Sequence, residues 1–173
     1  LWRGEIEQDE TVALRYVSPD GENGYPGNLS VTVRYRLTEE NELVIDYTAE
    51  TDRATPCSLT DHSYFNLAGE GSGSVEDHEL AIFADHYTPT DEKMTHLGKV
   101  ATVDGGANDL REPKPIGEAV PTILNGHGDN YLLAREPRET PVLAARAVEP
   151  VSGRTLEVLT TERCLQFYTG VFV

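Results

Sequence analysis

The stretch that decides the fold reads Leu29-Ser30-Val31-Thr32-Val33-Arg34-Tyr35-Arg36-Leu37. Its odd-numbered positions are apolar or aromatic and its even-numbered positions are polar or charged, which is a strict period of two. Because side chains alternate between the two faces of a β-strand, the pattern predicts a half-buried strand over 29–37. After a Glu39-Glu40-Asn41 turn, the alternation resumes over 43–49. The two runs together predict an antiparallel hairpin.

Outward from this hairpin, apolar runs separated by polar, Gly-rich or Pro-rich links predict eight further strands. These runs cover 11–17, 56–67, 79–84, 99–103, 130–135, 142–148, 154–161 and 165–173. The short Val151–Arg154 link predicts a second hairpin, while the connections over 18–28 and 104–128 are long. Since no window has a sustained helical period, we expect an all-β, large antiparallel β-sandwich or barrel that forms a single domain over 1–173.

Composition limits the partners and the compartment. Thirty acidic against 14 basic residues leave a net charge of −16, which argues against nucleic acid and anionic membranes as partners. We interpret this charge as a solvated acidic surface, with adaptation to a high-salt cytoplasm as the sharper hypothesis. The chain has two cysteines, Cys57 and Cys164, without a C-x-x-C spacing and within apolar runs. They are expected to be buried free thiols in a reducing, cytoplasmic compartment.

Two clusters of polar and aromatic residues are candidates for chemistry. His62 lies in Leu59-Thr60-Asp61-His62-Ser63-Tyr64-Phe65-Asn66-Leu67, and a histidine can exchange a proton near neutral pH. Gln166 lies in Leu165-Gln166-Phe167-Tyr168-Thr169-Gly170, where an amide can bind sugar hydroxyls beside rings that cover a pyranose face. By themselves, such clusters are more often a hydrogen-bonded core histidine and a core strand with one polar residue. The spacing of the histidines predicts no metal site, and neither a G-x-S-x-G nor a G-x-G-x-x-G motif is present.

The order of these strings along the chain adds a further indication. It runs through Gly24-Tyr25-Pro26-Gly27-Asn28-Leu29, the Asp61–Gly69 block, Asp85-His86-Tyr87, Asp109-Leu110-Arg111 and Gln166–Gly170. In this order, and most specifically in His-Ser-Tyr-Phe-Asn-Leu and Gln-Phe-Tyr-Thr-Gly, the chain resembles the aldose 1-epimerases (galactose mutarotases) over nearly all of its 173 residues.

The resemblance implies a mutarotase-like β-supersandwich that interconverts the α and β anomers of a free hexose without metal or cofactor. It implies that His62 is the general acid at the ring oxygen and that Gln166 contacts the sugar. The family also has a sugar-binding Asp in a Gly-aromatic-Asp-x-Asn-aromatic string, for which the comparable stretch is Gly126–Tyr131. An alignment without gaps puts Gly128 at that Asp position, and Asp129 is the candidate substrate-binding residue.

The resemblance also implies that the family's general-base glutamate lies beyond the Gln-Phe-Tyr-Thr-Gly string, and no glutamate of this chain has a matching context. The chain is therefore expected to cover about the central half of a family member, truncated at both ends. A non-catalytic sugar-binding or structural remnant is the alternative function. A hexose-phosphate epimerase is disfavoured because phosphate binding needs a basic cluster. The expected partners are an aldose and, through exposed sheet edges, further copies of the chain.

Overall fold

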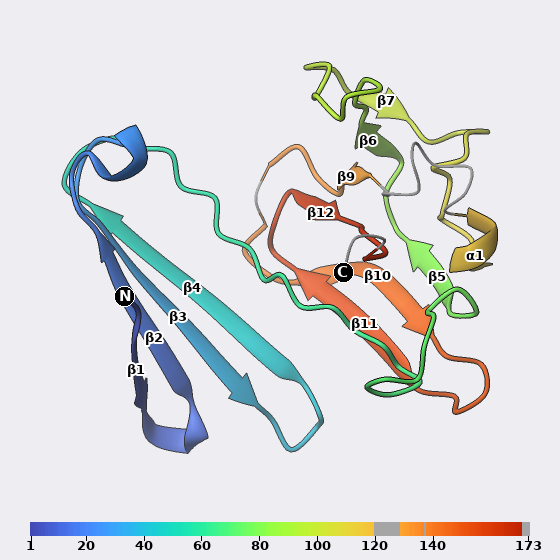
Figure 1. The fold of residues 1–173 in the computed structure, drawn as a ribbon, viewed down its shortest axis with the longest axis horizontal. Helices are drawn as coiled ribbons and strands as arrows, with labels where there is room; N and C mark the ends of the chain where they lie inside the picture. Colours follow the sequence, from blue (N-terminus) through green and yellow to red (C-terminus); the bar gives the residue numbers. More distant parts are fainter. Residues whose placement is uncertain (120–128, 137, 171–173) are drawn as a thin grey trace. The chain divides into compact units, whose positions relative to one another are not determined.

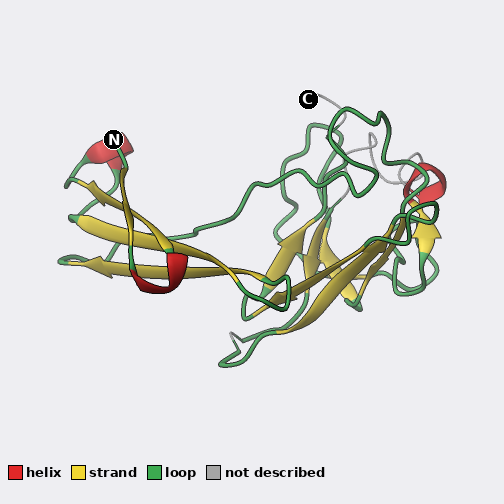
Figure 2. Cartoon of the chain, turned by 90° about the horizontal axis from the view of Figure 1, so that it is seen from below, coloured by secondary structure: helices red, strands yellow, loops and turns green. Residues whose placement is uncertain are grey.

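The computed structural model describes residues 1–119, 129–136 and 138–170, and most of its regular elements are β-strands (Figures 1 and 2). Its internal contacts divide the chain into two compact units, Leu1–His62 and Ser63–Val173. The single domain over 1–173 stays a prediction. Among the described residues, none of the helices has the length and apolar composition needed to cross a bilayer.

The first unit contains one four-stranded antiparallel sheet in the order β1-β2-β3-β4 (Figure 1). Its strands are Arg3–Ile6 (β1), Val12–Ser18 (β2), Leu29–Leu37 (β3) and Leu43–Thr51 (β4), with short 3₁₀ turns at Gln8–Glu10 (η1) and Glu22–Gly24 (η2). The predicted hairpin is confirmed, because β3 and β4 pair with Tyr35 opposite Ile45. The alternation decides burial where the strand is central, since Val31 and Val33 are buried.

The second unit contains two four-stranded sheets (Figure 1). One has the order β11-β10-β5-β8, from Thr155–Thr160 (β11), Val142–Val148 (β10), Glu79–Ile82 (β5) and Lys114–Pro115 (β8). The other has the order β12-β9-β6-β7, from Cys164–Gln166 (β12), Asn130–Leu132 (β9), His86–Thr88 (β6) and Ala101–Thr102 (β7). A four-residue helix, Ile116–Ala119 (α1), follows β8. All of these strand pairs are antiparallel, which confirms the all-β class and the hairpin at Val151–Arg154.

One apolar core joins the two sheets of the second unit. Ile82 of β5, Ala145 of β10 and Tyr131 of β9 belong to the same buried cluster, together with Val103 and Leu110 from the connections. Tyr131 and Val103 have no exposed surface. Burial of side chains of this size stabilises the fold by about 1.5–3 kcal/mol each. The core therefore holds the short strands β9 and β12 against the longer hairpin of β10 and β11.

Several expectations were wrong in detail. Residues 54–66 form neither a helix nor a strand, so the strand over 56–67 is absent; the run is apolar but lacks the period of two. The strand over 99–103 shrinks to β7, and the one over 165–173 ends at Gln166, with 171–173 outside the described residues. Cys57 and Cys164 are free but exposed, because one lies in the irregular segment and the other points outward from β12.

Arg111 organises the connection that follows β7. Its guanidinium group donates to Asp109 through Nε (2.9 Å) and Nη2 (2.7 Å), to Asp104 through Nη2 (2.6 Å) and to Asp85 through Nη1 (3.0 Å). The hydrogen bonds from Arg111 lower the pKa of Asp109 to about 2, against the opposing effect of partial burial. The two-point contact with Asp109 is the geometry in which a guanidinium binds a carboxylate most strongly.

We predict that Asp109→Asn lowers the free energy of unfolding by about 1–2 kcal/mol at pH 7, a value reduced for the partial exposure of the side chain. Because the folded pKa of Asp109 is depressed to about 2, its contribution is present above the ordinary carboxyl pKa and is lost as pH falls toward 2. Urea denaturation at pH 7, 5 and 3 measures the difference. The matched control is Asp77→Asn at an exposed position, and an equal effect of both variants would contradict the prediction.

Candidate functional site

The register of β9 creates a row of polar side chains. In the sheet of the second unit, Asn130 lies opposite Gln166 of β12 on one side and opposite Thr88 of β6 on the other. Residues directly opposite in an antiparallel ladder share a face, and Tyr131, the next residue in β9, is buried in the core. The row Thr88–Asn130–Gln166 therefore lies on the face away from that core. Within it, Asn130 Nδ2 donates to Thr88 Oγ1 at 2.8 Å.

Asp129 lies at the start of β9 with only 6% of its surface exposed. Its carboxylate accepts a hydrogen bond from Asn108 Nδ2, and its backbone oxygen accepts one from the Phe167 amide at 3.0 Å. Asn108 is held in turn by Tyr131, whose hydroxyl donates to the Asn108 carbonyl at 3.1 Å. Burial raises the pKa of Asp129 to about 6, and the charge of His96 opposes this rise. This carboxyl group titrates close to neutral pH.

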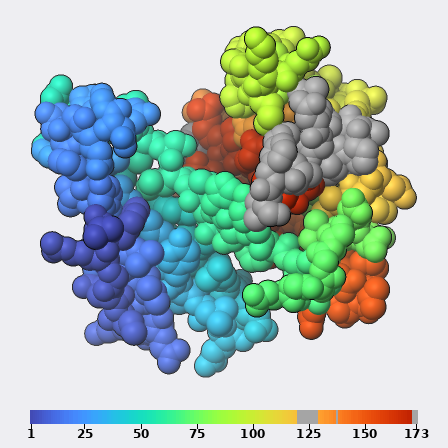
Figure 3. All heavy atoms as spheres, viewed as in Figure 1, coloured from blue at the N-terminus to red at the C-terminus, as the bar shows by residue number. Residues whose placement is uncertain are grey.

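Two of the strings that carry the resemblance meet in the second unit. Tyr64 and Tyr168 pack edge to face, with ring centroids 6.0 Å apart and an interplanar angle of 71°. Such a contact contributes about 0.5–1.5 kcal/mol beyond burial of area. Tyr64 and Phe65 are each 51% exposed. Figure 3 shows the chain around residues 60–70, in green, at the surface of the face drawn. Aromatic side chains thus lie at the surface next to the strand that ends at Gln166.

The structure brings two of the three predicted site residues together. Asp129 directly precedes β9, and Gln166 is the last residue of β12, which pairs with β9; the Asp129 carbonyl accepts a hydrogen bond from the Phe167 amide. Gln166 is exposed, and its Nε2 donates to the Phe167 carbonyl at 3.0 Å. His62 is exposed and is the last residue of the first unit, directly before Ser63 in the sequence. His127 and Gly128 lie outside the described residues.

The neighbours of these residues were not predicted from the sequence. Asn108 is separated from Asp129 by 21 positions and Thr88 from Asn130 by 42, so no local pattern joins them. The nearest signal was the Asp109-Leu110-Arg111 string, which directly follows Asn108. Within the described part of the chain, no group of three or more His, Cys, Asp or Glu side chains is placed to hold a metal ion. The chemistry available at the site is hydrogen bonding, stacking and proton transfer.

Comparison with known proteins places these features in a wider context. The family model described as aldose 1-epimerase matches residues 1–173. Galactose mutarotase of Rattus norvegicus is 45% identical over 174 residues, covering 100% of this chain and 50% of the rat protein. Galactose mutarotase of Homo sapiens is 47% identical over 163 residues, 94% of this chain and 47% of the human protein. Aldose 1-epimerase of Escherichia coli is 36% identical over 177 residues, covering 99% of this chain and 51% of the E. coli protein. The chain thus spans about half the length of these relatives.

Solved structures agree with the fold. An aldose epimerase homologue from C. elegans superposes with a TM-score of 0.86 at 24% identity, covering 99% of this chain and 52% of that one. Galactose 1-epimerase from Lactobacillus acidophilus superposes with a TM-score of 0.71 at 31% identity, covering 86% of this chain and 44% of that one.

We predict that Asp129→Asn stabilises the chain at pH 8 by on the order of 1–3 kcal/mol and has little effect near pH 4. Because burial raises the folded pKa of Asp129 to about 6, the protonated form favours folding at low pH, and this contribution is lost as pH rises through 6. Urea denaturation between pH 4 and pH 8 measures it. Asp109→Asn is the internal control, since its effect has the opposite sign. A destabilising effect of Asp129→Asn at pH 8 would refute the assignment.

Proposed function

Because this chain belongs to the aldose 1-epimerase family, we propose that it forms part of an isomerase that interconverts the α and β anomers of a free hexose, galactose or glucose. The observation that carries the proposal is the row Thr88–Asn130–Gln166 beside the packed rings of Tyr64 and Tyr168. Amide and hydroxyl groups suit sugar hydroxyls, and exposed ring faces suit the apolar side of a pyranose.

The proposed reaction needs one acid and one base. A carboxylate base removes the proton from the C1 hydroxyl while the C1–O5 bond breaks and its electron pair moves to O5. The acid donates a proton to O5, which gives the open-chain aldehyde. Rotation about C1–C2 and the reverse proton transfers close the ring on the other face and restore both groups. Each of the two proton transfers accelerates the reaction by about 10²–10⁴-fold.

His62 is the proposed acid, because it begins the His-Ser-Tyr-Phe-Asn-Leu string by which the chain resembles the family and because it is exposed. Gln166 is proposed to bind sugar hydroxyls through its exposed amide. Asp129 is proposed to act as a hydrogen-bond acceptor for the sugar; with a pKa of about 6, its carboxyl group is an anion above that pH. The sugar is the proposed small-molecule partner, and the cytoplasm is the proposed compartment.

Non-catalytic sugar binding is the second candidate, and one observation favours it. The row Thr88–Asn130–Gln166 and the rings of Tyr64 and Tyr168 offer hydrogen bonds and stacking, which bind a sugar without any proton transfer. A binding protein would retain affinity for galactose or glucose without accelerating anomerisation. Polarimetry of fresh α-D-galactose, combined with calorimetric titration of the equilibrated sugar, separates the two: rate above the spontaneous background supports the isomerase, whereas binding without acceleration supports the alternative.

We predict that His62→Asn lowers the rate of mutarotation about 100-fold or more in the natural polypeptide that contains this chain, because the ring oxygen loses its proton donor. Polarimetry of fresh α-D-galactose or α-D-glucose measures the rate, and circular dichroism checks that the fold is retained. The control is Glu40→Gln, a titratable side chain exposed in the turn between β3 and β4, which should keep the parent rate. A His62→Asn variant that retains more than about a tenth of the rate would move the acid elsewhere.

We predict that Gln166→Ala raises KM roughly 5- to 100-fold and changes kcat much less, which corresponds to about 1–3 kcal/mol of lost hydrogen bonding. A neutral amide can bind hydroxyl groups but cannot supply the proton that O5 requires. Steady-state polarimetry over a range of sugar concentrations separates the two constants. Gln8→Ala, at an exposed position in η1, is the matched control. A fall in kcat at constant KM would instead assign Gln166 to the chemical step.

A further inference from the structure

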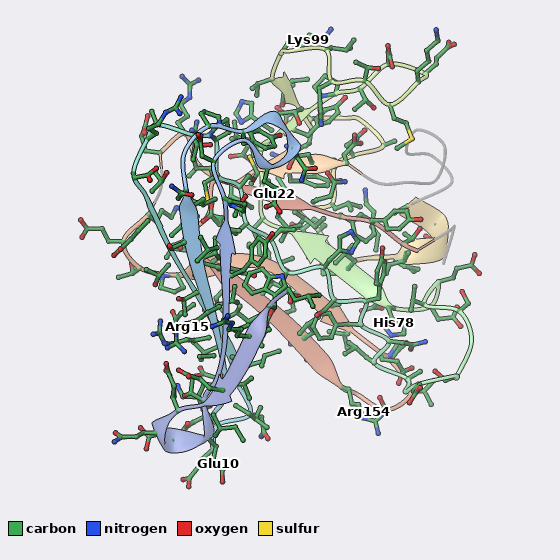
Figure 4. All side chains as sticks on the ribbon, turned by 60° about the vertical axis from the view of Figure 1, so that its left-hand side comes forward. Glu10, Arg15, Glu22, His78, Lys99 and Arg154 are labelled. Atoms are coloured by element: carbon green, nitrogen blue, oxygen red, sulfur yellow. The ribbon has the colours of Figure 1, made fainter. Side chains whose placement is uncertain are left out.

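The peptide group at Leu67 is held from both sides by side chains. Its amide donates to Nε2 of His78 at 3.0 Å, and its carbonyl accepts from Nη1 of Arg154 at 2.9 Å. Figure 4 labels both residues, His78 directly before β5 and Arg154 at the turn between β10 and β11. Leu67 closes the string that begins at His62. The core hairpin and the central strand of one sheet are thereby connected to this string.

His78 is buried, and one of its two ring nitrogens lacks a hydrogen-bond partner among the described residues. Its side chain is 4% exposed, and the nitrogen without a partner there is Nδ1. Because Nε2 accepts the Leu67 amide proton, the neutral ring carries its own proton on Nδ1, and a buried donor without a partner costs about 1–3 kcal/mol. An apolar side chain would fill the same space without this cost. We infer that a histidine occupies this position because its Nε2 accepts the hydrogen bond from the Leu67 amide.

The position of Arg154 is also specified. The buried carboxylate of Glu149 accepts the amides of Val151 (2.9 Å) and Ser152 (2.7 Å), and the Glu149 amide donates to the Arg154 carbonyl at 2.9 Å. These bonds close the turn in one geometry. The turn thus fixes where the guanidinium of Arg154 leaves the backbone.

The string belongs to no ladder, because residues 54–66 form neither a helix nor a strand. At the end of this segment, Asn66 donates to the Gly73 carbonyl at 3.0 Å and accepts from the Ala68 amide at 3.0 Å, while Gly69 adopts φ +118°, a conformation open to glycine. These bonds shape a local turn. The bonds at Leu67 connect this turn to His78, directly before β5, and to the hairpin of β10 and β11.

We propose that His78 and Arg154 are positioning residues: by holding Leu67, they orient the segment 63–67, which carries Tyr64 and directly follows the proposed acid His62 in the sequence. This role rests on the proposed function, in which His62 donates a proton to the ring oxygen. Misplacement of a reacting group by about 1 Å can lower a rate about 100-fold, so an orienting hydrogen bond acts on kcat more than on KM. Neither residue is proposed to touch the sugar.

The test compares matched pairs of variants in the natural polypeptide that contains this chain. His78→Gln keeps an acceptor near the Nε2 position, whereas His78→Leu removes it; Arg154→Lys keeps a donor, whereas Arg154→Met removes it. Arg146→Met is the control, because Arg146 is an exposed arginine in the same hairpin whose ion pair is with Glu157. Amide hydrogen exchange at Leu67 and Asn66 reports the local order, and polarimetry gives kcat and KM.

We expect His78→Leu and Arg154→Met to speed exchange at Leu67 about 10-fold and to lower kcat at least as much, with KM changed less than about 3-fold. His78→Gln and Arg154→Lys should stay within about 3-fold of the parent in both measurements, and Arg146→Met should match the parent. If His78→Leu fails to fold, Arg154→Met decides, because that side chain is exposed.

The proposal is overturned if His78→Gln is as impaired as His78→Leu, or if Arg154→Met behaves like Arg146→Met. Failure of the proposed function is a different result: the parent protein would not accelerate anomerisation at all. In that case, exchange at Leu67 and Asn66 still decides whether the two side chains hold the segment, since exchange does not depend on turnover.

Discussion

Complete burial of Tyr131 is the constraint on which the rest of the second unit depends. The side chain lies in the core shared by both sheets, and its hydroxyl donates to the Asn108 carbonyl. With Tyr131 inside, the alternation of β9 directs Asn130 to the opposite face, and pairing places Gln166 and Thr88 beside it. A shift of one residue would exchange the two faces. Burial of one aromatic ring thereby fixes the register of the polar row and the place of Asn108 beside Asp129.

Prediction from sequence succeeded where a local pattern carries the information. The alternation in 29–37 and 43–49 predicted the hairpin, because a period of two is visible within each strand. In β3 it also predicted the buried residues Val31 and Val33, whereas no residue of β4 is buried. The turn at Val151–Arg154 was identified for a similar local reason. Two runs without alternation were misassigned: residues 56–66 form no strand, and within the described residues 165–170 the strand ends at Gln166. The composition of such a run indicates that its side chains pack against others, but it does not show whether a neighbouring strand is available for backbone pairing.

The candidate site was predicted only residue by residue. Motif order predicts His62, Gln166 and Asp129 as site residues, whereas the surroundings of Asp129 and Gln166 come from contacts between distant parts of the chain. Two aspartates have pKa values that are shifted in opposite directions. The hydrogen bonds from Arg111 lower the pKa of Asp109 to about 2, whereas burial raises the pKa of Asp129 to about 6. Nothing in the local sequence distinguishes the two carboxylates, since the difference lies in which partners the fold brings within reach. Electrostatic roles therefore have to be read from the structure.

Under the proposed mechanism, the irregular backbone around His62 explains how several consecutive side chains can face a sugar. Asp61, His62, Ser63, Tyr64 and Phe65 are five consecutive exposed residues. A half-buried strand would turn alternate side chains into the core, so it could present His62 and Tyr64 to a sugar but not the residues between and beside them. An irregular segment presents all of them, but it has no ladder of backbone hydrogen bonds to hold it. Hydrogen bonds from side chains then take the place of the ladder. The peptide group of Leu67 is bound by the buried imidazole of His78 and by the guanidinium of Arg154. These bonds attach the segment while the proposed acid, His62, stays exposed.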